Sequence, residues 1–368
     1  MDSKRYTAKL LKKSELAGTM ATQRIEEFEI TRPEGFPTTT PGSSIGIYPQ
    51  NSPNLVDKLL SMNKFDGSTN VTINDKEMPL IKALTEVLEL SQLTRYTLQN
   101  YLKFIDIDYL TEMMDEPEQI NILLEGKDIV DFLQETPIHN MTIDMLLTIL
   151  GPIKPKYFFI SKREETEDTI QFIATEKIYK HLGAEKKDHF STYLLDQLKT
   201  GQPLIITHSP QKSFTLPANH AADIIMIGAE AGICPFRSFI HHRKISQATG
   251  KSWLMFSAQN EDTDFIYKVD IEEALENGHL CKLDTAYKAD RDQSIYIQHK
   301  VREHKDEIID WVQKGAHLYV CADTDHKVTI VHNTIIRAIT EVQNIEFETA
   351  EDYLFELERL GQYQRFTF

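Results

Sequence analysis

The stretch IIMIGAEAGICPFRSF, which begins at Ile224, is the first candidate for chemistry. It reads as a buried strand, a turn with glycines and the start of a helix. Gly228 can adopt backbone angles closed to other residues, and Gly232 allows a ligand or a neighbouring element to approach closely. Unpaired N–H groups at the helix start would favour a phosphate. A tight turn without a ligand would use the same glycines, so the spacing leaves both interpretations open.

Charged residues in this stretch bear on that choice. Glu230 lies in the middle of the turn, and a carboxylate a few ångströms from a phosphate costs on the order of 1 kcal/mol or more. Glu230 therefore argues against a bound phosphate. Pro235 suits the start of the helix. Arg237 lies about two turns along it, where it faces either the ligand or the solvent.

The segment AYKADRDQSIYIQHK carries a second candidate site. Lys288 and Arg291 lie beside a predicted strand end, where basic side chains could hold a ribose 2′-phosphate. Tyr296 could stack on an adenine ring. A solvated charged loop has the same composition, and composition alone favours that interpretation.

Aromatic residues offer a third candidate. In PIKPKYFFISK, Lys156 is followed by Tyr157, Phe158 and Phe159, which could present their faces to a flat ring. Such a run in a strand is more often part of the core. Phe368 ends the chain, where it either caps a pocket or frays. The histidines and the separated cysteines lack metal-ligand spacing, so the sequence predicts no metal site.

The elements that must position these residues follow a clear order. Strand-like alternation covers the first fifty residues or so, helical spacing follows, and strands return near Pro155. After Ala221 strands and helices alternate, which is typical of a doubly wound parallel sheet. We therefore predict a β domain (1–53 and 148–220), a helical insertion (54–147) and an α/β domain (221–368). The α/β strands should end together near Gly228, Ala258, Lys288 and Asp323.

Bulk composition narrows the class of protein. The 368 residues are 41% hydrophobic and 26% charged, with a formal net charge of −16. These values predict a globular protein with neither nucleic acid nor membrane as a partner. The first residues lack an apolar signal core, and no apolar run is long enough to span a bilayer, so we expect a cytoplasmic location.

Several motifs recur in the order of a known family. The motifs are PGSSIGIYPQN, IKPKYFFIS, FSTYLLDQL, MIGAEAGICPFRSF, SIYIQHKVRE, GAHLYVCAD and YQRFTF. In this order the chain resembles the C-terminal half of the diflavin reductases, a family that includes the sulfite reductase flavoprotein subunit. The resemblance implies a ferredoxin–NADP⁺ reductase-like fold: an antiparallel FAD-type barrel with a helical connecting insertion, then a Rossmann-like NADP-type domain. The flavodoxin-like FMN domain that normally precedes these elements is not seen.

The resemblance also implies cofactors, a partner and site residues. Electrons would pass from NADPH through FAD to a separate acceptor, either a flavodoxin-like protein or a hemoprotein subunit. The implied FAD residues are Lys156, Tyr157, Phe158, Ser191, Thr192 and Phe368. The implied NADP residues are Gly228, Gly232, Pro235, Arg237, Lys288, Arg291, Tyr296, Gln298 and Asp323.

Departures from the family pattern concentrate where the reacting rings would meet. Phe159, Ala258 and Phe366 replace a serine, a cysteine and an acid, so no catalytic residue can be named. Glycine positions of the scaffold survive while these polar positions do not. Two hypotheses follow. One is an FAD-dependent NADPH oxidoreductase with impaired activity, and the other is a non-catalytic protein that senses a nucleotide or serves as a partner subunit.

Overall fold

A computed structural model describes residues 4–16, 23–124, 126–161, 168–181, 184–209, 214–288 and 296–367. The chain forms two compact units. The first unit comprises Met1–Gly46, Tyr157–Thr175 and Thr200–Phe368, and the second comprises Ile47–Lys156 and Glu176–Lys199. The division into three domains inferred from the sequence stays a prediction.

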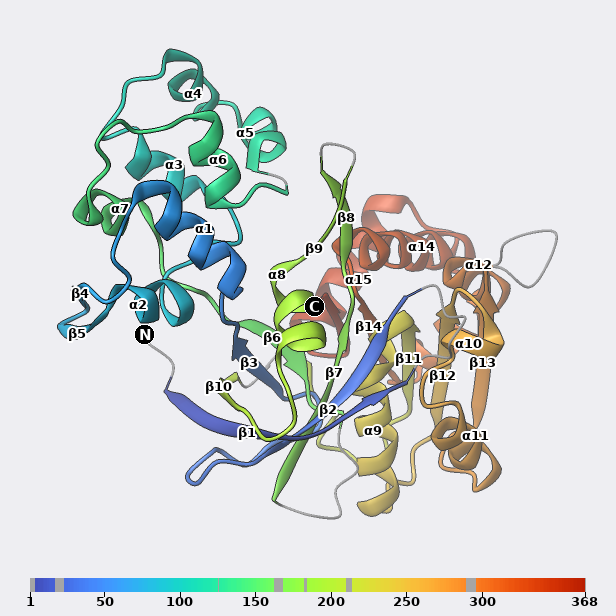
Figure 1. Cartoon of the computed structure of the whole chain (residues 1–368). Helices are drawn as coiled ribbons and strands as arrows, with labels where there is room; N and C mark the ends of the chain where they lie inside the picture. Colours follow the sequence, from blue (N-terminus) through green and yellow to red (C-terminus); the bar gives the residue numbers. More distant parts are fainter. Residues whose placement is uncertain are drawn as a thin grey trace. The chain divides into compact units, whose positions relative to one another are not determined.

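An antiparallel sheet of six strands runs in the order β6-β3-β10-β1-β2-β7 (Figure 1). Its strands are β1 (Arg5–Glu15), β2 (Ile25–Thr31), β3 (Ser44–Tyr48), β6 (Lys156–Phe159), β7 (Thr169–Thr175) and β10 (Pro203–Ser209). An antiparallel bridge between Ile160 and Phe172 links the ends of the order, which closes the sheet into a barrel. Stacked rings of Phe28 and Phe172 lie in its core.

A parallel sheet of five strands follows in the order β13-β12-β11-β14-β15. The strands are β11 (Ile224–Ala229), β12 (Ser252–Ala258), β13 (Lys282–Tyr287), β14 (His317–Ala322) and β15 (Tyr363–Thr367). After β11 the next strands along the chain, β12 and β13, lie on one side of β11, whereas β14 and β15 lie on the other side. The strand order therefore reverses between β11 and β14, where open α/β sheets bind ligands.

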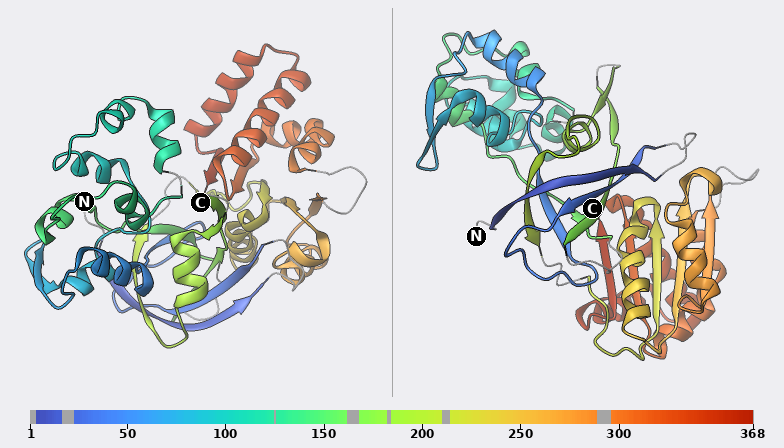
Figure 2. Two further views of the ribbon diagram at one scale, coloured as in Figure 1. Left: turned by 45° about the horizontal axis from the view of Figure 1, so that its top comes forward. Right: turned by 60° about the horizontal axis from the view of Figure 1, so that its bottom comes forward.

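Helices cover both faces of the parallel sheet (Figure 2, right). Alternate residues of each strand point to opposite faces, so Met226 packs in one core and Ile225 in the other. The first core includes α9 (Cys234–Ile245) and α11 (Lys268–Glu276), and α10 (Glu261–Asp264) precedes α11. The second includes α12 (Ile297–Glu303), α13 (Lys305–Gln313), α14 (Asp325–Gln343) and α15 (Phe347–Arg359). The predicted two-part fold with a doubly wound sheet is confirmed.

The second unit is mainly helical. Its helices are α1 (Pro53–Asn63), α2 (Leu80–Glu86), α3 (Arg95–Tyr101), α4 (Asp108–Met113), α5 (Pro117–Leu124), α6 (Ile129–Glu135) and α7 (Ile143–Ile149). The hairpin β4 (Asn70–Ile73) and β5 (Lys76–Pro79) interrupts them, and a later segment adds β8 (Ile178–His181), β9 (Ala184–Lys187), α8 (His189–Ser191) and the π-helical turn η1 (Thr192–Gln197). Leu84, Tyr101, Phe132 and Leu146 fill the core between the helices.

A short strand that was not predicted from the sequence precedes the last residue of the chain. Residues Tyr363–Thr367 form β15, a parallel edge strand beside β14. Tyr363 is fully buried, because the strand pairs with β14 and Tyr363 packs in the second core. Phe368 itself lies outside the described residues.

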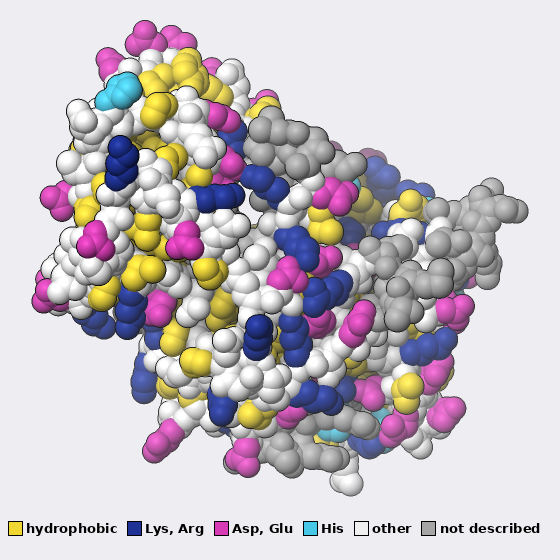
Figure 3. Space-filling view, viewed as in Figure 1, with side chains coloured by type: hydrophobic (Ala, Val, Ile, Leu, Met, Phe, Trp, Pro, Cys, Tyr) yellow, Lys and Arg dark blue, Asp and Glu magenta, His cyan; other side chains and the backbone are white. Residues whose placement is uncertain are grey.

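Acidic and basic side chains are interspersed over the face drawn in Figure 3. Hydrophobic side chains are also visible among the described residues of that face. Among the described helices, none has the length and apolar character needed to cross a bilayer.

Candidate functional site

The turn after β11 is built by close packing around its glycines. A Cβ atom on Gly232 would lie 2.1 Å from the carbonyl oxygen of Cys321 in β14, a distance that only glycine avoids. A Cβ atom on Gly228 would lie 3.1 Å from the ring of Phe236 in α9. The turn continues through the 3₁₀ segment η2 (Glu230–Ile233) into α9. Packing against β14 and α9 thus accounts for the glycines whether or not a phosphate binds.

Glu230 occupies the centre of this turn with an unusual backbone. Its φ is +53°, in the left-handed region that glycine tolerates better than glutamate. The carboxylate spans two ammonium groups: Oε1 lies 3.2 Å from Lys288 Nζ, and Oε2 lies 2.7 Å from Lys327 Nζ. Burial acts to raise the pKa of Glu230, but hydrogen bonds and charge from Lys327 and Lys288 outweigh it and lower the pKa. Glu230 is therefore ionised at neutral pH.

Lys327 extends the network to the next strand end. Its Nζ donates to Asp323 Oδ1 at 2.8 Å, one turn back at the start of α14. Burial acts to lower the pKa of Lys327, but the bonds to Asp323 and Glu230 more than reverse this, so the pKa is raised. The structure thus brings together Glu230, Lys288 and Asp323, which the sequence placed at different strand ends. Lys327 was not predicted from the sequence, although its i,i+4 spacing from Asp323 was the available signal.

Tyr296 lies next to this network. The Lys288 ammonium is 5.8 Å from the centre of the Tyr296 ring, which is 39% exposed. Tyr296 precedes α12, and Gln298 is half-buried within that helix. The exposed Tyr296 ring could stack on a nucleotide base, and the Lys288 ammonium beside it could pair with a phosphate of the same nucleotide. Arg291 lies outside the described residues.

Arg237 points away from the turn into a separate set of contacts. Its Nε bonds Asp270 Oδ2 at 2.6 Å, and its Nη1 bonds Glu27 Oε1 at 3.2 Å and the Ser161 carbonyl at 3.1 Å. The guanidinium also lies 4.0 Å from the centre of the Tyr267 ring. These contacts join α9 to the barrel strand β2. The assignment of Arg237 and of buried Pro235 to NADP remains a prediction, and the Arg237 contacts do not support it.

The positions that resemble the flavin-facing ones are packed with aromatic rings. Phe159 is 4% exposed, and its ring centre lies 4.8 Å from that of Phe366 and 5.4 Å from that of Phe214. Phe158 is also buried and lies against Phe172 in the barrel. Tyr157, which precedes Phe158 in β6 (Lys156–Phe159), is half-buried. Neither buried ring offers a hydrogen-bond donor to a flavin, so this part of the site does not fit the polar family arrangement.

Ala258 ends β12 in the same core as Phe159. Its side chain is buried and apolar, while its carbonyl accepts a hydrogen bond from the Lys288 N–H at 3.3 Å. The structure therefore places Phe159, Ala258 and Phe366 in one core cluster or packed against it. Phe159 and Phe366 are in contact, whereas Ala258 lies on β12, which two strands separate from the β15 strand of Phe366, and none of the three side chains can exchange a proton.

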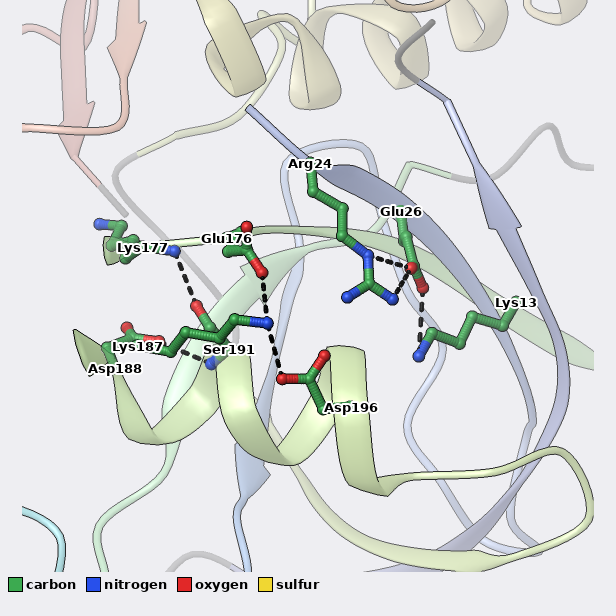
Figure 4. Close-up of polar contacts among 9 residues, drawn as sticks. All are labelled: Lys13, Arg24, Glu26, Glu176, Lys177, Lys187, Asp188, Ser191 and Asp196. Carbon is green, nitrogen blue, oxygen red and sulfur yellow. Dashed lines mark hydrogen bonds and ion pairs between the residues drawn. The ribbon is translucent and has the colours of Figure 1, made fainter. Parts of the chain in front are cut away.

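A second turn, in the second unit, also carries its own carboxylate (Figure 4). Asp188 Oδ1 accepts from the Ser191 N–H at 2.6 Å, and the Asp188 carbonyl accepts from the Thr192 N–H at 3.0 Å. Lys156 Nζ lies 3.8 Å from Asp188 Oδ2. Burial lowers the pKa of Lys156, partly opposed by Asp188. The Ser191 and Thr192 N–H groups are thus both bound within the chain.

Ser191 and its surroundings complete that turn. The Ser191 hydroxyl accepts from the Lys177 N–H at 2.8 Å. Lys187 lies between Glu176 and Asp196, at 2.8 Å from each (Figure 4). The assignment of Lys156, Ser191 and Thr192 to FAD remains a prediction.

Comparisons with known proteins agree with this architecture. Residues 226–324 match the family described as the oxidoreductase NAD-binding domain. The chain is 30% identical over 365 residues to the sulfite reductase [NADPH] flavoprotein alpha-component of Bacillus subtilis (strain 168), which covers 98% of this chain and 60% of the relative. The protein of the same name from Yersinia pestis is 30% identical over 360 residues, covering 98% of this chain and 59% of the relative.

The chain thus spans about three-fifths of the length of the curated relatives that it matches. The names of these relatives describe NADPH-dependent flavoproteins, and the matched domain is described as NAD-binding. The aligned part is the C-terminal part of the relatives. The barrel, the doubly wound sheet and the match over nearly the whole chain lead to one conclusion: the chain has the ferredoxin–NADP⁺ reductase type of fold, carries an oxidoreductase NAD-binding domain and is similar over nearly its whole length to the sulfite reductase flavoprotein alpha-components.

Proposed function

We propose that this chain is the FAD- and NADPH-binding part of a flavoprotein oxidoreductase that passes electrons to a separate acceptor. The observation that carries the proposal is the closed barrel followed by a doubly wound sheet, aligned over 98% of the chain with flavoprotein alpha-components. Both elements serve nucleotide binding in such reductases. The cofactors supply the redox chemistry, while the protein binds and orients them.

On the NADP side the described residues fit a phosphorylated nucleotide. Lys288 and Lys327 supply ammonium groups at the switch point of the sheet, and Tyr296 supplies an exposed ring. Lysine binds phosphate as a point charge, and an aromatic face suits adenine. The ligand has to compete with Glu230 for the lysines, so we expect weak binding.

On the flavin side we assign no side chain to proton transfer. Phe159, Phe366 and Ala258 are apolar, and the two rings are in contact. General acid–base groups typically contribute factors of about 10² to 10⁴ to a rate, and none is available at these positions. Slow turnover is therefore part of the proposal.

A second candidate function is a non-catalytic nucleotide sensor or partner subunit with weak or no flavin binding. The observation that favours it is the pair of carboxylates, Glu230 and Asp188, at the turns that the resemblance relates to phosphates. Each carboxylate uses cations or N–H groups that a nucleotide would need. In this case the protein has the reductase fold but does not catalyse electron transfer.

A separate acceptor and a cytoplasmic location belong to the same proposal. The relatives are named as one component of sulfite reductase, which supports an acceptor on another protein, either a hemoprotein subunit or a flavodoxin-like protein. The cysteines Cys234, Cys281 and Cys321 are all free thiols, as expected in a reducing compartment.

The deciding experiment is a visible absorption spectrum of the purified protein after incubation with FAD, recorded before and after anaerobic addition of NADPH. A flavin band that bleaches with NADPH, even slowly, supports the oxidoreductase. Protein that neither carries flavin nor quenches the fluorescence of added FAD contradicts it and leaves the sensor or partner subunit.

A further inference from the structure

We infer that the Glu230 carboxylate is a built-in occupant of the anion-binding position at the β11–β14 switch point, so that a phosphate-bearing ligand enters only by displacing it. Glu230 lies on the turn after β11, Lys288 directly after β13, and Lys327 in the first turn of α14. The ammonium groups from these different elements meet at one carboxylate, with Nζ–O distances of 3.2 and 2.7 Å. Cations gathered in this way are suited to an anion, and here the chain supplies that anion itself.

The charge balance explains why a ligand must displace the carboxylate. Among the described residues the network holds Glu230 and Asp323 against Lys288 and Lys327, so the formal charges of these four groups cancel. A phosphate that approached the intact network would gain no net attraction and would meet the Glu230 charge. When the Glu230 side chain swings out, both ammonium groups regain donors, and Asp323 stays as the carboxylate bonded to Lys327.

The backbone of Glu230 agrees with this role. Its φ of +53° is unfavourable for a residue with a side chain, and the ion pairs hold it there. A glycine would adopt the same angle without this restraint. The ion pairs are partly buried, with Glu230 at 19% side-chain exposure, so solvent screens them less than surface pairs. The inference rests on the proposed function in one respect: it takes the turn after β11 as the turn that faces the nucleotide.

The test is direct binding, measured by titration calorimetry on the full chain without flavin. The probes are adenosine 2′,5′-bisphosphate and inorganic phosphate. We expect Glu230→Gln to bind the bisphosphate about tenfold more tightly than the native protein, which corresponds to about 1.4 kcal/mol. Lys327→Gln, added to Glu230→Gln, should abolish the gain. A gain for the bisphosphate alone identifies a nucleotide site, and an equal gain for inorganic phosphate identifies a site for phosphate itself; both support the inference.

The matched control is Glu273→Gln, which removes a carboxylate from an exposed pair with Lys244 at 3.6 Å in the same unit. The inference is overturned if Glu230→Gln binds the bisphosphate with an affinity within twofold of that of the native protein. It is also overturned if Glu273→Gln gains as much affinity as Glu230→Gln. If Glu230→Gln does not fold, Glu230→Gly suits the backbone angle and provides the same comparison. Tighter binding without any flavin uptake would leave this inference standing while removing the proposed oxidoreductase.

Discussion

The rings of Phe159 and Phe366 meet edge to face, with centres 4.8 Å apart. Phe159 ends a barrel strand, and Phe366 lies in the edge strand β15, in register with Cys321 of β14. The contact therefore ties the barrel to the parallel sheet at the place where the resemblance puts the reacting rings. The Phe159–Phe366 contact stabilises the first unit, but neither ring can donate a hydrogen bond or transfer a proton.

Phe159→Ser should raise the affinity for FAD and lower stability. The substitution restores a small hydroxyl side chain and opens space beside Phe366, but it removes a buried ring, which costs about 3 to 5 kcal/mol in comparable cores. Fluorescence quenching of FAD and urea denaturation measure the two effects. Phe239→Ser is the control, because Phe239 is fully buried in the same cluster but lies within α9. Equal FAD affinity in the two variants would show that Phe159 does not restrict the flavin.

The stability of the native protein relative to Glu230→Gln should depend on acid pH. The ordinary pKa of the glutamate is 4.5, and the lysines lower it in the folded protein. A lowered folded-state pKa stabilises the fold fully above the unfolded-state value and loses this contribution as pH falls through the folded-state value. Urea denaturation of both proteins should therefore give a difference in unfolding free energy that is constant near neutral pH and shrinks below about pH 4.5. A difference that grows with acidity would mean that the lysines do not hold the carboxylate ionised.

Gly232→Ala should destabilise the fold by more than about 2 kcal/mol, as expected for overpacking against backbone. The added methyl group would lie 2.1 Å from the Cys321 carbonyl oxygen, and a main-chain atom cannot move aside alone. Gly35→Ala is the comparison, since Gly35 has φ +69° and open space around it. That change should cost only about 1 kcal/mol, from backbone strain. Similar losses in thermal or urea denaturation would contradict the close packing of the turn against β14.

Arg237→Gln separates a structural role from a nucleotide-binding one. Arg237 lies between Glu27 and Asp270 with 13% of its side chain exposed, and removing it leaves those carboxylates without their shared cation. We expect a loss of about 3 kcal/mol in unfolding free energy, as for other broken buried pairs. Binding of adenosine 2′,5′-bisphosphate to Glu230→Gln should change less than twofold when Arg237→Gln is added. A tenfold loss of affinity for the bisphosphate would show that Arg237 takes part in binding the nucleotide.

Much of the fold was predictable from the sequence because its signals are local. Consecutive apolar residues such as Ile225 and Met226 mark a strand buried on both faces, and strand–helix alternation implies a parallel sheet. The glycine positions around Glu230 identified the turn. The terminal strand β15 was missed, since a short polar-aromatic segment forms a strand only when a neighbour such as β14 supplies the hydrogen bonds.

The sequence by itself determined the resemblance to flavoprotein reductases, the order of barrel, helices and doubly wound sheet, and the apolar side chains at Phe159, Ala258 and Phe366. Only the tertiary structure decided that Glu230 is held by Lys288 and Lys327, and that Arg237 serves the junction with the barrel. The physical reason is distance: an ion pair depends on where side chains from separate elements meet. Spacing along the chain does not specify those meetings, because they follow from how the strands and helices pack.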